Sequence, residues 1–119
     1  MSHPMKPVRI TYDPDGDILY ITFGQPTAAT GYQLSDQVLL RIDRKTQSAA
    51  GLTIFNYSMH ASATRKLPLP GIENDLGIKP VLLRILTTAP VNHFLRLTKG
   101  KQGVSVTLRS PSLQEAVAA

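Results

Sequence analysis

The stretch Ile10-Thr-Tyr-Asp-Pro-Asp-Gly-Asp-Ile-Leu-Tyr-Ile21 consists of two apolar and aromatic runs joined by an acidic turn. Pro14 sets φ for the turn, aspartate side chains bond to nearby backbone, and Gly16 adopts a left-handed conformation without a steric clash. Strand-forming residues on both sides of such a turn predict a β-hairpin. The hairpin gathers three carboxylates at its tip, those of Asp13, Asp15 and Asp17.

The register of this hairpin follows from the turn type that we expect, a type I turn with a glycine bulge. The expected cross-strand pairs are Asp13 with Asp17, Tyr12 with Ile18, and Ile10 with Tyr20. The second strand, from Ile18 to Phe23, is apolar at both parities, which is typical of a strand that is central or covered on both faces. We therefore expect another part of the chain to cover this sheet.

A chain of 119 residues, 42% hydrophobic and 18% charged, has the length and composition of one folded domain with a modest core. Because the chain contains no cysteine, disulfides, thiolate metal sites and thiol nucleophiles are excluded. The apolar run Val81–Leu83 is cut short by Arg84, and no apolar run follows Lys6. Neither a membrane span nor a signal peptide is predicted, so we expect a cytoplasmic protein without membrane contact.

Alternating apolar residues predict a third strand over residues 38–43 and a fourth over 49–55, joined by the polar turn 44–47. The segment 24–35 is rich in small and polar residues and should be irregular or an edge strand. Two consecutive hairpins predict a four-stranded antiparallel meander within residues 8–56.

Residues 57–79 lead from polar side chains into Leu67-Pro-Leu-Pro-Gly71, a composition typical of a linker. Pro68 and Pro70 should therefore be extended rather than helical.

The segment 80–119 is expected to contain a helix and a hairpin. Pro80 suits the first turn of a short helix that ends near Pro90, with a strand as the alternative because β-branched residues are present. Two alternating runs, 94–98 and 104–109, flank a glycine-containing turn and predict a third hairpin. Ser112 should cap a last helix over residues 113–118. The sequence thus predicts one α+β domain over residues 1–119, mostly of antiparallel β structure.

The first half is similar to a known family. The motif consists of Tyr12-Asp13, Asp17, Leu19-Tyr20-Ile21, Asp36, Val38-Leu-Leu40, Ile42-Asp43, and Gly51-Leu52 with Ile54. It resembles a family of small, mostly bacterial domains of unknown function, over roughly residues 8–56. The chain departs from the family pattern at Thr30-Gly-Tyr32-Gln33, in the turn before Gly51, and throughout its last sixty or so residues. The resemblance implies a compact antiparallel β domain and supplies no catalytic residue.

The aspartates of the tip alternate as at the start of a calcium loop, where oxygen ligands surround a hard cation. The match fails because Gly16 lies between the second and third aspartate, and Gly24 stands where a bidentate glutamate is needed. A solvated tip also lacks the cleft that an acid–base pair requires. We expect no metal-binding, cofactor-binding or catalytic residue here.

Histidine is the residue best suited to proton transfer near neutral pH. His60 lies in the linker-like segment, His93 opens a predicted strand, and His3 lies near the start of the chain. A hydrolase that combines one of the tip aspartates with a histidine is the weakest of three functional alternatives, because spacing alone does not bring these residues together.

The net charge of +5 comes from the second half of the chain. Residues 1–60 hold five basic and five acidic side chains, whereas residues 61–119 hold eight basic and three acidic ones. A polyanion would meet this half, through side chains that include Arg84, Arg96, Lys99, Lys101 and Arg109. A nucleic-acid-binding or antitoxin-like regulatory module is the second functional alternative.

The leading hypothesis is a non-catalytic interaction module. A β-rich domain with an apolar second strand can form a homo-oligomer or dock a protein partner, through an open sheet edge or through an apolar face.

Overall fold

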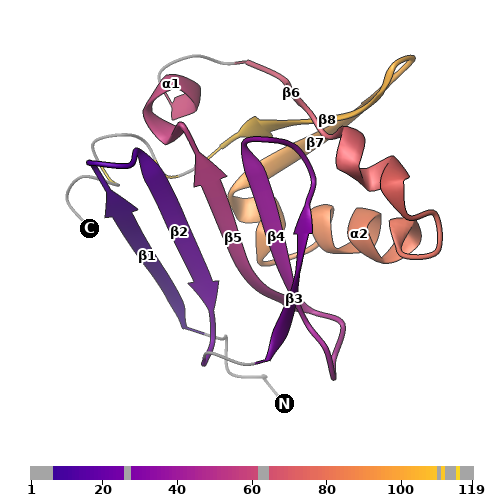
Figure 1. Cartoon of the computed structure of the whole chain (residues 1–119), viewed down its shortest axis with the longest axis horizontal. Coiled ribbons are helices and arrows are strands. Elements are labelled where there is room, and N and C mark those ends of the chain that lie inside the picture. The colour runs from indigo at the N-terminus through magenta and orange to yellow at the C-terminus, as the bar shows by residue number, and fades with distance from the viewer. Residues whose placement is uncertain (1–6, 26–27, 62–64, 110, 112–114, 116–119) are drawn as a thin grey trace.

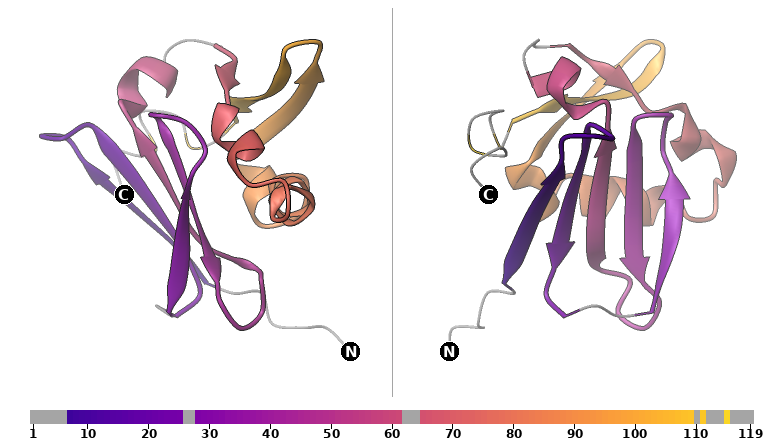
Figure 2. Two further views of the ribbon diagram at one scale, coloured as in Figure 1. Left: turned by 45° about the vertical axis from the view of Figure 1, so that its right-hand side comes forward. Right: turned by 60° about the vertical axis from the view of Figure 1, so that its left-hand side comes forward.

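Two antiparallel sheets and a helix build the molecule (Figure 1). The structure is a computed structural model that describes residues 7–25, 28–61, 65–109, 111 and 115. One layer is a five-stranded sheet, and the second layer combines helix α2 with a three-stranded sheet (Figure 2). The predicted class, α+β with mostly antiparallel strands, is confirmed.

The first sheet contains β1 (Val8–Asp13), β2 (Ile18–Phe23), β3 (Ala29–Gln33), β4 (Val38–Asp43) and β5 (Ala49–Phe55). Its strand order is β1-β2-β5-β4-β3. The prediction of a four-stranded meander is therefore wrong in topology, because β5 lies between the two earlier hairpins. β5 is the most buried of these strands and takes the central place, where both of its edges are paired. β3 is the far edge strand, as expected for this segment.

The register of the first hairpin differs by one residue from the prediction. Tyr12 pairs with Leu19, and Ile10 pairs with Ile21. The left-handed residue of the turn is Asp17, with a φ of 56°, and not Gly16. Asp17 is held in this conformation from outside the hairpin, because its carbonyl accepts a hydrogen bond of 3.0 Å from the backbone N–H of Tyr57. A one-residue change of register moves Ile10 and Tyr12 onto the face of β2 that is buried.

The described residues of the segment 57–79 form regular elements, which differs from the linker that the composition predicted. They form α1 (Tyr57–Ala61), β6 (Leu67–Pro68) and the 3₁₀ helix η1 (Pro70–Asn74). Pro68 is extended as predicted, whereas Pro70 starts η1, a position where the missing N–H of proline is tolerated. The apolar residues between the prolines decide the structure here, because Leu67, Leu69 and Ile72 are buried in the core.

The second layer follows the predicted elements closely. α2 (Lys79–Leu86) is the helix expected after Pro80, and β7 (Leu95–Gly100) with β8 (Gly103–Leu108) is the expected hairpin. The 3₁₀ helix η2 (Val91–His93) connects them, and β6 pairs with β8 to complete the second sheet. Of the helix predicted over residues 113–118 with Ser112 as its cap, only residue 115 is among the described residues, so the prediction is not tested.

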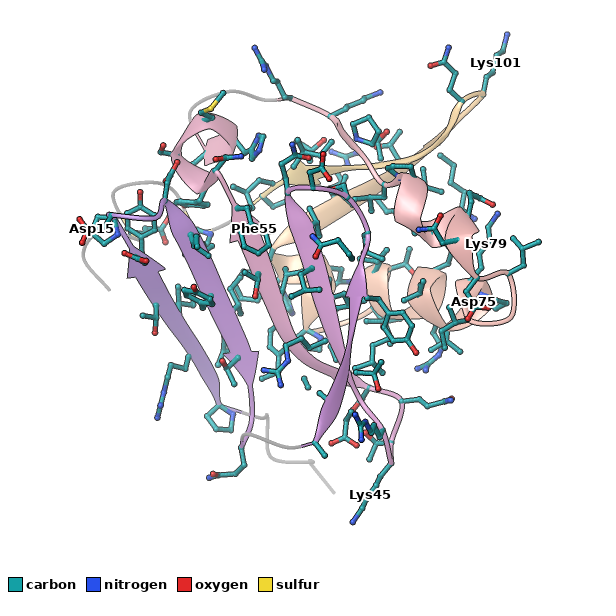
Figure 3. The ribbon with its side chains drawn as sticks, viewed as in Figure 1. Asp15, Lys45, Phe55, Asp75, Lys79 and Lys101 are labelled. Atoms are coloured by element: carbon teal, nitrogen blue, oxygen red, sulfur yellow. The ribbon has the colours of Figure 1, made fainter. Side chains whose placement is uncertain are left out.

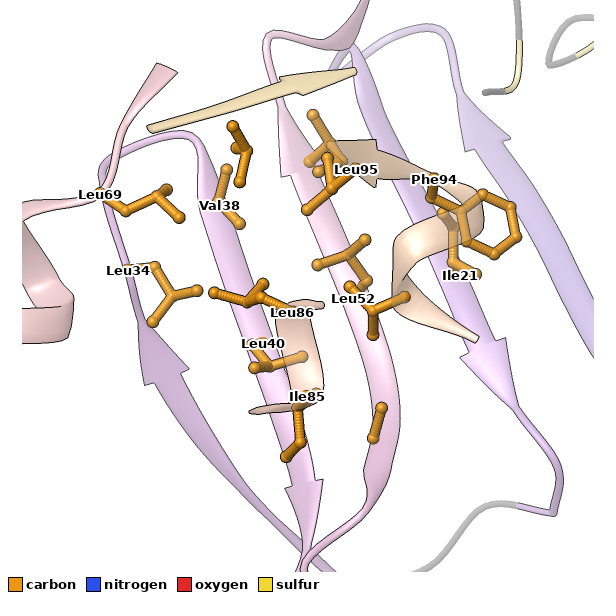
Figure 4. Close-up of a cluster of buried hydrophobic side chains, with 14 of the residues drawn as sticks. Ile21, Leu34, Val38, Leu40, Leu52, Leu69, Ile85, Leu86, Phe94 and Leu95 are labelled. Carbon is orange, nitrogen blue, oxygen red and sulfur yellow. The ribbon is translucent and has the colours of Figure 1, made fainter. Parts of the chain in front are cut away.

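The core lies between the two layers (Figure 4). We call the face of the five-stranded sheet that is turned toward the second layer the inner face, and the opposite face the outer face. The inner face contributes buried residues that include Leu19, Ile21, Val38, Leu40, Leu52 and Ile54, and the second layer contributes Leu82, Leu86, Leu95 and Val106. The expected cover thus exists, and it lies on one face of the sheet.

Candidate functional site

Asp17 is the one tip aspartate that contacts another element through its side chain. Its Oδ1 accepts hydrogen bonds from the hydroxyl of Tyr12 at 2.7 Å and from the backbone N–H of Ser58 at 3.0 Å. Its Oδ2 accepts a bond of 2.7 Å from Ser58 Oγ. Because Ser58 lies in the first turn of α1, the carboxylate satisfies a backbone donor that the short helix leaves open. Asp17 thus joins the hairpin to α1.

These hydrogen bonds determine the protonation state of the Asp17 carboxyl group. Burial disfavours the charged form of Asp17, but the hydrogen bonds from Tyr12 and Ser58 outweigh burial, so the pKa of Asp17 is lowered. The bond to this carboxylate, with burial, raises the pKa of Tyr12. Asp17 is therefore an ionised acceptor whose oxygens are already engaged, which leaves it poorly suited to act as a base.

The other two tip aspartates behave differently. Asp13 Oδ1 accepts a bond of 3.0 Å from the backbone N–H of Asp15, an arrangement typical of an aspartate turn. Asp15 is exposed at the outer end of the hairpin (Figure 3). Within the described ranges, no three histidine, aspartate or glutamate side chains are placed to hold a metal ion.

The structure brings His60 toward Asp17 but leaves His93 apart from it. His60 lies on α1, and both of its ring nitrogens are buried without a hydrogen-bond partner among the described residues. Burial lowers the pKa of His60, and the charge of Arg65 adds to this effect while Asp17 opposes it. Ser58 Oγ donates to Asp17, so the serine is not activated by His60. This geometry does not favour the Asp/His hydrolase.

Tyr57, which the sequence reading did not single out, anchors the same region. Its ring is fully buried and packs edge-to-face on Tyr12, with ring centroids 5.5 Å apart. Burial raises the pKa of Tyr57 to about 12, and its hydroxyl donates a bond of 2.5 Å to the carbonyl of Pro111. The hairpin end is thus held by packing and satisfied hydrogen bonds.

The outer face of the five-stranded sheet is the feature with the clearest capacity for binding. None of the described elements covers it, as the left view of Figure 2 shows. Strand register arranges most of its side chains in three rows across the sheet, with the pair Ala29 and Asp43 beyond the lower row. The upper row holds Asp13, Ile18 and Phe55; the middle row holds Thr11, Tyr20, Thr53, Leu39 and Gln33; and the lower row holds Arg9, Thr22, Gly51, Arg41 and Gly31.

Apolar and aromatic side chains gather in the upper and middle rows of this outer face, and Arg9 and Arg41 stand in the lower row. Tyr20 is 42% exposed, and Phe55 stands beside Ile18 in the upper row (Figure 3). Thr53 is only 7% exposed although it points away from the core, because larger side chains of the same face surround it. In the lower row a Cβ added at Gly51 would touch the stem of Arg41 at 3.8 Å, so this arginine lies over the glycine.

The five basic residues named from the sequence are spread over several elements. Arg84 lies on α2, Arg96 and Lys99 on β7, and Lys101 at the hairpin tip, while Arg109 donates a bond of 3.1 Å to the carbonyl of Asn92. Figure 3 shows Lys101 pointing away from the body of the molecule. Among the residues that the structure describes, no helix is long and apolar enough to cross a membrane.

Comparison with known proteins agrees with the resemblance seen in the sequence. Residues 9–58 match the family described as "Protein of unknown function (DUF2283)". The matched part runs from the second residue of β1 to Ser58, and so contains the five-stranded sheet except Val8, and the bonds between Asp17 and Ser58. Comparisons with curated proteins and with solved structures give no match.

Proposed function

We propose that this protein is a self-association module in which two copies pack their outer faces against each other. The observation that carries the proposal is a group of apolar and aromatic side chains, Ile18, Tyr20, Leu39 and Phe55, on a sheet face that no described element covers, with Tyr20 42% exposed. Apolar surface of this kind on a folded domain is typical of an interaction site. The proposal thus assigns the outer face as the interface of the homo-oligomer that the sequence predicts.

The rows of this face support a second copy as the partner. A two-fold axis along the middle row places the upper row of one copy over the lower row of the other. Phe55 then lies over Gly51 of the second copy and the Arg41 stem that covers this glycine, so an aromatic ring meets an arginine side chain. Asp13 lies over Arg9 of the second copy, so opposite charges meet. Both contacts occur twice, as symmetry requires, in the aligned packing that two sheets prefer.

Pairing through the sheet edges is less well supported. The edge strands are β1 and β3, and each carries charged or polar side chains or glycine beside its free edge. Short edge strands with polar residues discourage strand addition.

Sedimentation velocity over a concentration series tests the proposal. We expect a reversible monomer–dimer equilibrium for the unchanged chain, and a shift to monomer for Tyr20→Asp, because Tyr20 lies in the row on the axis and the substitution places two carboxylates against each other. Leu76→Asp is the matched control: Leu76 is 68% exposed away from the sheet and should leave the equilibrium unchanged. Circular dichroism establishes that each variant is folded.

A strictly monomeric unchanged chain at the highest soluble concentration would overturn the proposal. A dimer that both aspartate variants leave intact would place the interface elsewhere and would also overturn it. Exchanging the charges of Arg9 and Asp13 tests the position of the two-fold axis, which places these two residues of different copies over each other. Arg9→Asp alone should weaken the dimer, and the double variant with Asp13→Arg should restore the dimer.

A second candidate function, nucleic-acid binding, is favoured by the projecting β7–β8 hairpin. Lys66 and Lys101 line one hollow of about 400 Å³ at this hairpin, together with neutral residues. Binding through these lysines should weaken steeply with salt, because neutralising phosphates releases counterions. A titration with DNA and RNA at two salt concentrations, repeated with Lys101→Glu, tests it. Absent or salt-insensitive binding would contradict this function.

A further inference from the structure

A cavity of about 560 Å³ opens at the end of the sheet opposite the hairpin tip, between the five-stranded sheet and the second layer. Its apolar lining comes from five separate segments and includes Val8, Phe23, Ala49, Ile85, Pro90 and Phe94. Cavities that bind small molecules commonly measure roughly 300–1,000 Å³ and are mostly apolar with a few polar groups. This cavity has that size and that composition.

An aromatic pair forms part of its wall. The rings of Phe23 and Phe94 lie with centroids 5.9 Å apart and their planes tilted by 42°. Both residues are buried, with exposures of 2% and 8%. Buried aromatic rings that pack on each other give a rigid surface, so the apolar part of a ligand would meet a wall that is already formed.

The polar groups of the cavity are cationic or neutral. Arg84 lies at its edge, and its Nη2 donates a hydrogen bond of 2.9 Å to the carbonyl of Gln47, which fixes the guanidinium. A guanidinium carries five N–H donors, so others remain for a ligand. Ser48, Thr88 and His93 are the remaining polar residues of the lining, and no carboxylate is among its described members.

We propose that this cavity binds a small monocarboxylate with an apolar body, an aliphatic or aromatic acid. The apolar body would lie against Phe23 and Phe94, and the carboxylate would bind Arg84, whose planar fork of donors matches two carboxylate oxygens. An uncharged molecule of the same size would gain the apolar contacts but would lose this charge-assisted pair. The proposal is independent of self-association, because the cavity lies on the inner side of the sheet.

The probes are octanoate and 1-octanol, which share a chain length and differ in charge. Isothermal titration should give saturable binding of one octanoate, and 1-octanol should bind more weakly. Arg84→Gln should weaken octanoate binding about tenfold and leave 1-octanol unchanged, because it removes a charge-assisted pair. Arg96→Gln is the matched control, since Arg96 is exposed on β7 outside the cavity. Amide chemical shifts of the unchanged chain should change around Phe23, Ile85 and Phe94.

Three results would overturn the proposal: no saturable binding of octanoate, equal affinity for both probes, or shift changes confined to other parts of the chain. A loss of octanoate binding in Arg96→Gln equal to that in Arg84→Gln would also overturn it, because it would indicate attraction by net charge alone. A monomeric chain that still binds octanoate would contradict the proposed self-association and leave this site standing.

Discussion

Asp17 links two elements through three side-chain hydrogen bonds and one main-chain bond, although sequence reasoning treated it as a turn residue. Its spacing from Asp13 and Asp15 gave no sign of this role, because the partner Ser58 lies 41 positions further along the chain. A residue that occupies a left-handed conformation without being glycine is often held there by its surroundings. At this scale the sequence predicts the local turn chemistry but not the distant partner.

Asp17→Asn should destabilise the protein by about 1–3 kcal/mol, since it leaves the donors of Tyr12 and Ser58 with a weaker acceptor while keeping the shape and the tolerance of positive φ. Asp15→Asn is the control and should change stability by less than about 0.5 kcal/mol, because Asp15 is exposed. Urea unfolding at pH 7 measures both.

The variants Asp17→Asn and Asp15→Asn also test how folding stability changes at acid pH. The pKa of Asp17 is lower in the folded state than its value of 3.8 in the unfolded chain. The contribution of ionised Asp17 to folding stability is therefore present above pH 3.8 and is lost as the pH falls through the folded-state pKa. Between pH 5 and pH 3 the gap in stability between the unchanged chain and Asp17→Asn should therefore narrow. A gap that is constant with pH would contradict the ionised role of Asp17.

His60 predicts a second pH dependence at a higher pH. Burial lowers its folded-state pKa below the ordinary 6.5, so the unfolded chain takes up a proton first as pH falls. The contribution of neutral His60 to folding stability is therefore complete above pH 6.5 and declines as the pH falls below that value. Chemical unfolding at pH 7.5 and pH 5.5 should show a loss of stability that His60→Gln reduces, and a loss that this variant leaves unchanged would contradict the prediction.

At the scale of elements, the individual strands and the helix α2 were predictable, because alternation and proline positions are local signals. The order of the strands was not, since the pairing of β2 with β5 joins residues that are 29 to 37 positions apart, from Thr22 with Gly51 to Ile18 with Phe55. Residues 57–79 were misjudged for a related reason. Prolines and polar residues dominate that segment by number, but Leu67, Leu69 and Ile72 determine where it lies.

η1 depends on one close backbone contact. Gly71 donates a hydrogen bond of 2.8 Å to the carbonyl of Leu34, and a Cβ added at Gly71 would lie 2.2 Å from the carbonyl oxygen of Gln33. Gly71→Ala should therefore move η1 away from the end of β3 and destabilise the protein by about 1–3 kcal/mol. Gly100→Ala is the control, because its nearest contact would be an ordinary 3.7 Å. Thermal unfolding compares them, and equal stability of both variants would contradict the contact.

At the scale of the whole molecule, the matched part of the chain builds one layer and the remainder covers it. A fragment of residues 1–61 would expose the inner face, including Leu19, Leu40, Leu52 and Ile54, all of which are fully buried in the complete chain. We expect this fragment to bind a hydrophobic dye and to unfold without a cooperative transition. A sharp unfolding transition in the fragment would mean that the five-stranded sheet is stable without its cover.

The candidate surfaces also differ in how far the sequence predicts them. An apolar outer face could be predicted from β2, because this strand is apolar at both parities. Which residues of other strands lie beside β2 on that face could be known only from the strand order. No pattern in the sequence predicts the cavity, because its lining residues belong to segments between Val8 and Phe94 that lie together only when the two layers pack.

The central place of β5 has a consequence for synthesis of the chain. β2 and β4 each bind β5 along one edge, and β5 is the last of the five strands to leave the ribosome. Until residue 55 has emerged, two short hairpins exist with no strand to join them, and each carries an open edge of apolar residues. The nascent chain thus completes its first sheet in a single late step, when one strand closes two edges together.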